Sequence, residues 1–306
     1  MKQETFTFKD PDGVDIFVYK WLPESENIKG IVQIAHGMAE TAARYERFAR
    51  FLTERGYAAY ANDHRGHGKT AKSIGEVGYI GEDGFNWMVK DMKQLNEIIL
   101  KEYPDKPLFL FGHSMGSLLC QRYISIYGDS IKGVILSGTC GNQGMMLNFG
   151  ISLAKMELRK KGARAKSERL DRLTFGSYNK GIKALVTKFD WLSRDKDEVD
   201  KYIKDPYCGG VFTTGFFYDF FVGCKEIHKK ENMQRIPKEL PIYIFSGMKD
   251  PVGRNCKTVK WLIDEYKNIG IKDVSYKFYE DGRHEMLNEI NRDEVMNNVV
   301  LWLDKH

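Results

Sequence analysis

Apolar and polar positions alternate in two short segments at the start of the chain. Residues 5–9 (TFTFK) and 14–21 (VDIFVYKW) each place every second side chain on one face, and residues 10–13 (DPDG) separate them. Period-two alternation on both sides of a Pro/Gly turn predicts an antiparallel hairpin with one face toward solvent.

The pattern then changes to nearly continuous apolar runs of strand length. Runs of this kind are typical of parallel strands that are covered on both faces, and a further strand is indicated near the end of the chain. The six segments are residues 30–35, 57–62, 107–112, 132–138, 241–247 and 274–280. Together with the hairpin, they predict a mostly parallel sheet of about eight strands.

Between these runs, apolar residues recur at i, i+3, i+4 and i+7, which is the spacing of one helix face. The clearest sets are Tyr45/Phe48/Ala49/Leu52, Phe85/Met88/Val89/Met92, Val259/Leu262/Ile263/Tyr266 and Met296/Val299/Val300/Leu303. Alternation of strands and helices predicts an α/β fold with helices on both faces of the sheet.

The alternation stops between about residues 140 and 240. This interval contains several helix-like pieces and an aromatic run at 210–223 (GVFTTGFFYDFFVG), but no parallel-strand signal. We therefore expect residues 141–238 to form a helical lid, or cap, inserted into a core made of residues 1–140 and 239–306.

Composition narrows the functional class. The 306 residues carry a formal net charge of +5, spread along the chain, so no concentrated basic face indicates nucleic-acid binding. The five cysteines are odd in number and form no Cys-x-x-Cys pair, which favours free thiols over a disulfide framework or a zinc site, and no metal or cofactor is implied. No signal-like or membrane-length apolar segment occurs, so a cytoplasmic location is expected.

The strongest candidate chemistry is the segment Gly-His-Ser-Met-Gly at 112–116, which follows an apolar strand and precedes a helix-like segment. A serine at a sharp strand-to-helix turn projects its oxygen above the sheet edge, and Gly112 and Gly116 remove side chains that would collide there. This arrangement predicts a nucleophile elbow with Ser114 as the nucleophile.

A serine nucleophile needs a base and an orienting carboxylate, in the chain order Ser, acid, His. Asp250 directly follows the run at 241–247 and His284 follows the run at 274–280, whereas the other histidines are out of order or lie in the lid or at the last residue. The backbone amides of Met38, after the third strand, and Met115, after the nucleophile, are expected to form the oxyanion hole.

Five motifs in order carry a family resemblance: HGMAE, NDHRGHGKT, GHSMGS, SGMKDPV and DGRHEML. With them the chain resembles the α/β-hydrolase fold and its monoacylglycerol lipase and lysophospholipase branch, also labelled serine aminopeptidase or hydrolase-4 type. The resemblance implies the same triad and oxyanion amides, a small-molecule lipid ester as substrate, and a structural role for Asp63 and Arg65 in tying down neighbouring strands.

The lid contains two further groups of residues that are candidates for contact with a substrate or a membrane. Five phenylalanines of the aromatic run are candidates for contact with the acyl chain of a substrate, although packing of the lid on the core explains them equally well. They are Phe212, Phe216, Phe217, Phe220 and Phe221. The basic stretch 155–169 is either a solvated helix face or a site of transient contact with an anionic membrane surface.

Two other functions stay open. An aminopeptidase would need an acidic anchor for the substrate amine, for which Glu157, Glu168 or Asp219 are candidates. A non-catalytic lipid-binding homologue would have a damaged triad or oxyanion loop, and the sequence shows neither.

Overall fold

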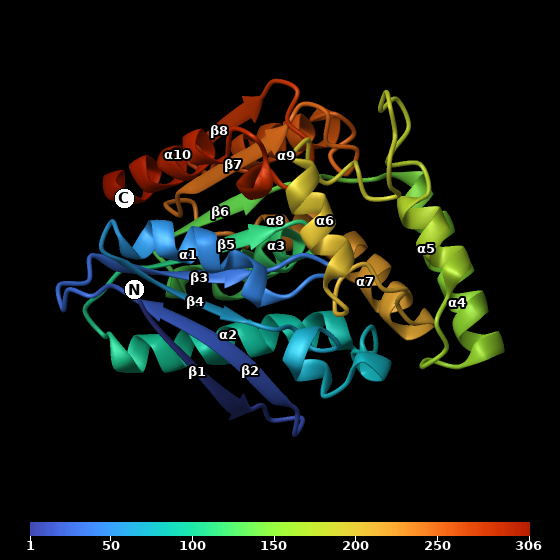
Figure 1. The fold of residues 1–306 in the computed structure, drawn as a ribbon, viewed down its shortest axis with the longest axis horizontal. Helices are drawn as coiled ribbons and strands as arrows, with labels where there is room; N and C mark the ends of the chain where they lie inside the picture. Colours follow the sequence, from blue (N-terminus) through green and yellow to red (C-terminus); the bar gives the residue numbers. More distant parts are fainter.

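The computed structural model describes residues 1–306 and forms one eight-stranded sheet flanked by helices (Figure 1). The strands are β1 (Lys2–Lys9), β2 (Asp15–Leu22), β3 (Gly30–Ala35), β4 (Tyr57–Asn62), β5 (Leu108–His113), β6 (Gly133–Ser137), β7 (Ile242–Gly247) and β8 (Val274–Tyr279). The strand order is β1-β2-β4-β3-β5-β6-β7-β8.

The direction of the strands agrees with the sequence pattern. Strands β1 and β2 pair antiparallel around the 10–13 turn, from Lys2 opposite Leu22 to Lys9 opposite Asp15, and β2 is antiparallel to β4. All other neighbours are parallel. The expected hairpin and the mostly parallel α/β sheet are therefore confirmed.

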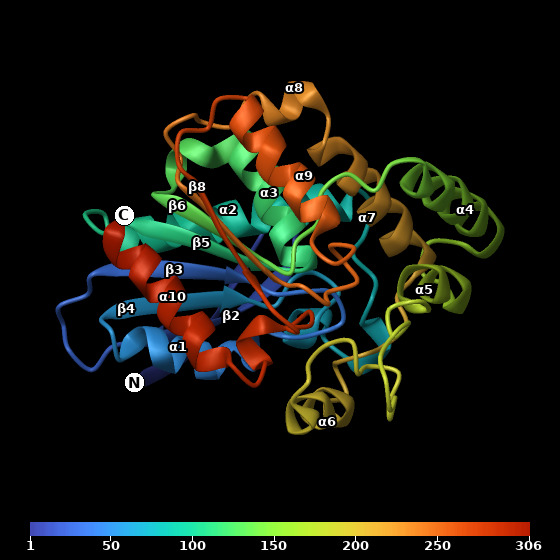
Figure 2. The same cartoon turned by 90° about the horizontal axis from the view of Figure 1, so that it is seen from above.

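Helices cover both faces of the sheet (Figure 2). They are α1 (Glu46–Thr53), α2 (Gly84–Glu102), α3 (Met115–Tyr127), α4 (Met145–Lys161), α5 (Glu168–Phe175), α6 (Lys196–Lys204), α7 (Thr214–Ile227), α8 (Lys230–Met233), α9 (Lys257–Asn268) and α10 (Arg292–Lys305). Apolar residues of α1 and α10 pack in one core cluster, and those of α2, α3 and α9 pack in the cluster on the opposite face. None of the helices combines the length and apolar character needed to cross a bilayer.

The continuous apolar runs are explained by this two-sided cover. In β5 every residue is buried, but Phe109 and Phe111 pack in the cluster with α1 and α10, whereas Leu110 packs in the cluster with α2 and α3. Since successive strand residues point to opposite faces, a strand covered on both sides needs apolar residues at every position.

Helices α4 to α8 lie between β6 and β7 in the chain, and we call residues 141–238, which contain them, the cap segment. Figures 1 and 2 show α4 to α7 gathered beyond the carboxyl ends of the parallel strands. Helix α7 packs against α2 and α3, and α4 packs against α7. Helices α4 to α7 therefore lie over the edge of the sheet where functional residues of α/β folds are found.

A buried ion cluster joins the turn of the first hairpin to the loop after β4 and to α2. The Arg65 guanidinium, just after β4, pairs with Asp10 in the hairpin turn and with Asp91 on α2 at 2.8 Å, and all three side chains are buried. Asp63 accepts the backbone N–H groups of Ala42 and Lys69, each at 2.8 Å. These contacts agree with the structural role that the resemblance implies for this loop.

We predict that Arg65→Met lowers the free energy of unfolding by about 3–5 kcal/mol, because it leaves buried carboxylates without a cation. Urea unfolding followed by circular dichroism measures the change. As a control, Arg55→Met removes a partly exposed guanidinium whose nearest carboxylate, on Glu54, is 3.9 Å away, and should change stability by less than about 1 kcal/mol. Equal effects of the two substitutions would contradict this account.

Candidate active site

Ser114 stands at the turn between β5 and α3 in a strained backbone conformation, with φ 50° and ψ −119°. The turn is tight: a Cβ on Gly116 would lie 2.0 Å from the Ala35 carbonyl oxygen, and a Cβ on Gly112 would lie 2.6 Å from the Gly116 carbonyl oxygen. Only glycine fits at either position, which is the geometry expected of a nucleophile elbow.

Asp250 and His284 follow β7 and β8, and the structure brings their side chains together. The His284 Nδ1–H donates to Asp250 Oδ2 at 2.9 Å, and Asp250 Oδ1 accepts the N–H of Val252 at 2.9 Å. The two loops approach closely because Gly247 has no side chain; a Cβ there would lie 2.1 Å from the Gly282 carbonyl oxygen. With Nδ1 used as a donor, Nε2 is left to accept a proton.

Ser114 and His284 line the same cavity, so the candidate base and the candidate nucleophile face one space. Burial disfavours the charged form of His284, but the Asp250 carboxylate outweighs it and raises the pKa of His284 above its ordinary value. The ring of His113 packs 4.7 Å from that of His284, and burial, with the charge of His284, lowers the pKa of His113 to about 4. His284 is therefore the ring in this pair that can take up a proton near neutral pH.

Two backbone amides are available beside Ser114. Neither the N–H of Met38 nor that of Met115 donates to another protein group, and Met115 is the first residue of α3. The loop that carries Met38 approaches the serine so closely that a Cβ on Gly37 would lie 3.2 Å from Ser114 Cβ. Two free N–H groups near a serine are the donor set that an oxyanion needs.

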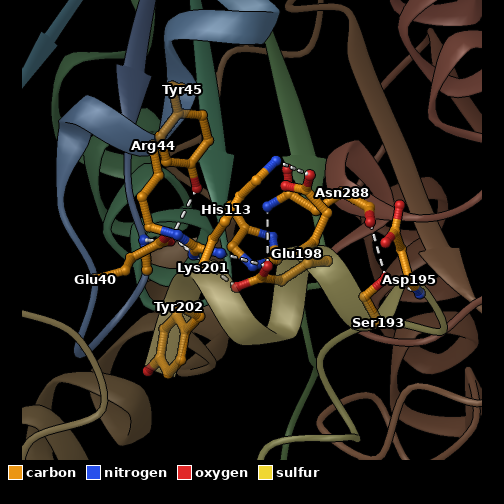
Figure 3. A network of polar contacts seen from close by, with 12 residues as sticks. Glu40, Arg44, Tyr45, His113, Ser193, Asp195, Glu198, Lys201, Tyr202 and Asn288 are labelled. Atoms are coloured by element: carbon orange, nitrogen blue, oxygen red, sulfur yellow. Dashed lines mark hydrogen bonds and ion pairs between the residues drawn. The ribbon is translucent and has the colours of Figure 1, made fainter. Parts of the chain in front are cut away.

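A buried ion pair network, which we call the Arg44 clamp, holds this loop (Figure 3). It consists of Glu40, Arg44 and Glu285: Arg44 Nη1 lies 2.5 Å from Glu40 Oε2, and the guanidinium binds both oxygens of Glu285 at 2.7 Å. Glu40 Oε1 accepts the N–H of Gly37 at 2.5 Å and the Tyr45 hydroxyl at 2.9 Å.

The clamp was not visible from the sequence. The position of Glu40 before a helix suggests only a charge at the helix start, and nothing in the motifs pairs Glu40 with Arg44 and Glu285. Burial opposes ionisation of Glu285, but the charge of Arg44 outweighs it and holds the pKa of Glu285 well below its usual range. The clamp therefore joins the loop after β3 to the residue that follows His284.

The cap segment also contacts the clamp and His284. The Tyr202 hydroxyl on α6 donates to the Ala39 carbonyl oxygen at 2.8 Å, and the Arg44 guanidinium lies 4.8 Å from the Tyr202 ring centroid. The Trp191 ring packs 4.9 Å from the ring of His284. Arg47 on α1 pairs with Glu198 on α6 at 2.6 Å.

Ser114 lies between two cavities. The apolar cavity, of about 520 Å³, is lined by Ser114 together with Met38, Leu118, Phe149, Phe220 and Phe221, among others. The polar cavity, of about 420 Å³, is lined by Ser114 and His284 together with Glu168, Asp171, Arg172 and Lys188, among others. Each volume lies in the range of small-molecule binding sites.

The aromatic residues of the cap segment differ in whether they line a cavity. Phe220 and Phe221 line the apolar cavity. Phe212, Phe216 and Phe217 line neither cavity and are wholly buried, with the Phe212 ring 4.9 Å from that of His67. The expectation of substrate contact is therefore corrected for these three, which pack the cap segment on the core.

The three carboxylates that are candidates for an amine anchor also differ in their surroundings. Glu157 is held by Lys161 and Ser167, and Asp219 accepts the N–H of Gly84, so both are used in cap packing. Of the three candidates, only Glu168 lines a cavity that contains Ser114.

Three kinds of comparison with known proteins relate this chain to ester hydrolases and their family. The family model described as "Serine aminopeptidase, S33" matches residues 26–291. A monoglyceride lipase of Mus musculus is 30% identical over 94% of this chain and 85% of its own, and a monoacylglycerol lipase of Mycolicibacterium smegmatis is 27% identical over 98% and 96%. A carboxyl esterase structure from Bacillus coagulans superposes with a TM-score of 0.92 at 29% identity, covering 100% of this chain and 99% of that one.

We predict that ester hydrolysis is lost on acidification through a pKa above about 6.5, the ordinary value for histidine. The base must be neutral to accept a proton, and Asp250 stabilises its charged form, so kcat/KM should fall as the pH drops through the raised pKa. Asp250→Asn should shift this acid limb downward and lower kcat by about four orders of magnitude. An unchanged pH–rate profile in this variant would show that Asp250 does not take part in catalysis.

We also predict that Arg44→Lys lowers kcat about tenfold to a hundredfold with little change in KM, because lysine cannot bind both carboxylates and the loop carrying Met38 loses its support. Steady-state kinetics on a soluble ester measure the effect. The matched control is Arg47→Lys on the neighbouring helical turn, which pairs with Glu198 but does not contact the loop. A fall of the same size in the control would show that the clamp is not specific to this loop.

Proposed function

The chain belongs to the serine aminopeptidase family, in its monoglyceride lipase branch, and from this premise we propose that Ser114 is the nucleophile with which it hydrolyses lipid esters. The observation that carries the proposal is the position of Ser114, at a strained turn between an apolar and a polar cavity, the second of which is also lined by His284, the partner of Asp250. An acyl chain fits the apolar cavity, and the alcohol part of the ester fits the polar one.

In the first half-reaction, His284 Nε2 accepts the hydroxyl proton of Ser114 as the oxygen attacks the acyl carbon. The amides of Met38 and Met115 stabilise the oxyanion of the tetrahedral intermediate. Asp250 holds the imidazole in place and stabilises its charged form. The proton then passes from His284 to the leaving alcohol as the ester C–O bond breaks, which leaves an acyl-enzyme.

In the second half-reaction, water takes the place of the alcohol. His284 accepts a proton from the water as it attacks the acyl carbon, and the same two amides stabilise the second oxyanion. Collapse releases the carboxylic acid and returns the proton to Ser114. The same groups serve both steps, so no further catalytic group is required.

We assign a lid function to the cap segment, residues 141–238. Helix α4 lines the apolar cavity with Met145, Met146 and Phe149, and these three side chains are 87%, 68% and 62% exposed. The last turn of α4 carries Arg159, Lys160 and Lys161. Exposed apolar side chains next to cations suit transient contact with an anionic lipid surface, through which a lipid substrate would enter.

The test is hydrolysis of an ester series from acetate to long-chain monoacylglycerol, with an aminoacyl amide alongside. We predict cleavage of the esters, labelling of the wild-type protein by a fluorophosphonate, and a fall in kcat of about 10⁵- to 10⁶-fold for Ser114→Ala without loss of folding. Cleavage of the amide alone would favour an aminopeptidase. A folded wild-type protein that is neither labelled nor active would favour a binding protein.

A further inference from the structure

The imidazole of His284 contacts a second aromatic ring besides that of His113. The indole of Trp191, from the cap segment, has its centroid 4.9 Å from that of His284, and the two ring planes are tilted by 40°. Both side chains are buried. This tilt is nearer to stacking than to the edge-to-face arrangement, in which the planes are perpendicular.

The backbone around Trp191 is bonded to the loop that carries His284. The N–H of His284 donates to the Trp191 carbonyl oxygen at 3.4 Å, and the N–H of Glu285 donates to that of Leu192 at 2.7 Å. The Arg283 guanidinium donates to two carbonyl oxygens of the same stretch, at 2.6 and 2.9 Å. These bonds determine where the indole lies relative to the imidazole.

Side chains of the cap segment hold the indole in its orientation. The Tyr178 ring meets it edge to face at 4.9 Å, and the Phe175 ring is stacked on it at 6.0 Å. The N–H of Trp191 donates to Asn179 Oδ1 at 2.9 Å. The indole is therefore fixed by the cap segment on which it stands and by the loop after β8.

An indole affects the two protonation states of an imidazole differently. Its π face attracts a cation that lies within about 6 Å of the ring centroid, and a neutral ring gains no such attraction. Burial of His284 opposes its charged form, and the Asp250 carboxylate offsets this. The indole excludes water from the imidazole and also favours the imidazolium, whereas an aliphatic side chain would only exclude water.

We propose that Trp191 is a positioning residue that holds the ring of His284 and stabilises its imidazolium form through the π face of the indole. This proposal rests on the ester hydrolysis proposed above, in which the imidazole takes the proton of Ser114 and gives it to the leaving alcohol. Since the imidazolium forms only during these steps, the contact lowers the barrier without tightening the binding of substrate.

Other charged and titratable groups also face this imidazole. Asp250, Glu40 and Glu285 favour its charged form. The pKa of His113 beside it is lowered to about 4 by burial, so that ring stays neutral above this pH. The polar cavity that the imidazole lines is also lined by four charged groups of the cap segment, Glu168, Asp171, Arg172 and Lys188. A substitution at Trp191 changes none of these groups, so a shift in the pKa of the imidazole reports on the indole.

The first measurement is the pKa of His284, by NMR titration of protein labelled with ¹³C at histidine Cε1 and assigned with His284→Gln. We expect Trp191→Leu to lower this pKa by about one unit. Trp191→Phe keeps a smaller π face and should lower it by about half as much, which also keeps the test open if Trp191→Leu does not fold.

The second measurement is the pH–rate profile on a soluble ester. In Trp191→Leu the imidazolium is less stable, so kcat on the alkaline plateau should fall about tenfold with little change in KM. The acid limb of kcat/KM should move about one unit lower, because the imidazole stays neutral to a lower pH. A site that is merely loosened would lose rate without this shift.

The matched control is Trp302→Leu on α10. Trp302 and Trp191 have the same exposed fraction, 7%, and the Trp302 ring lies 4.4 Å from that of His306 at a tilt of 35°. The control therefore removes the same kind of contact from a histidine that lines neither cavity. The pKa of His284 and kcat should stay at their wild-type values.

An unchanged or raised pKa of His284 in Trp191→Leu would overturn the proposal, because the indole would then act only by excluding water. Equal shifts in Trp191→Leu and Trp302→Leu would also overturn it. Either result leaves the proposed function intact if the wild-type protein cleaves esters. If the wild-type protein cleaves none, the proposed function fails, and the pKa of His284 still decides whether the indole stabilises the imidazolium.

Discussion

The Arg44 guanidinium lies between two buried carboxylates that come from segments far apart in the chain, since Arg44 and Glu285 are separated by 241 residues. Two carboxylates at this depth would repel each other and would not stay ionised without a cation between them. Arg44 therefore determines how the loop after β3 sits against the loop after β8. The amide of Met38 depends on the first loop and the imidazole of His284 on the second, so the geometry of both sides of Ser114 depends on this contact.

The strands and the order of the candidate triad could be predicted because they follow from local rules. Period-two alternation marked the first hairpin, and continuous apolar runs marked strands such as β5, whose alternate residues pack on opposite faces. The carboxyl ends of parallel strands meet at one edge, so residues directly after β5, β7 and β8 are expected near one another. The 2.9 Å contact between His284 and Asp250 lies at that edge.

The clamp and the two cavities could not be predicted in the same way, because they depend on side chains that meet only in the folded chain. Glu40 looks like a helix-start charge until its oxygens are seen on the Gly37 amide and on Arg44. The aromatic run of the cap shows no periodic difference between Phe216, which is buried in packing, and Phe220, which lines the apolar cavity. Both residues lie on α7, and only the position of that helix against α2 and α3 separates their roles.

The cap segment is attached to the core unevenly. The stretch around α6 makes more polar contacts with the core than α4 and α5 do. The stretch around α6 is bound by polar contacts to the core, including Arg194 to Glu289 at 2.9 Å and Tyr202 to the loop after β3. Helices α4 and α5 pack mainly on other parts of the cap, and their contacts with the core are few: Arg164 pairs with Glu76 at 3.0 Å and lies 3.9 Å from the Tyr79 ring centroid, and Met146 contacts Arg254. Weakly attached elements open at the lowest free-energy cost. We therefore expect α4 and α5 to open more readily than the stretch around α6, which contacts His284 and the loop after β3.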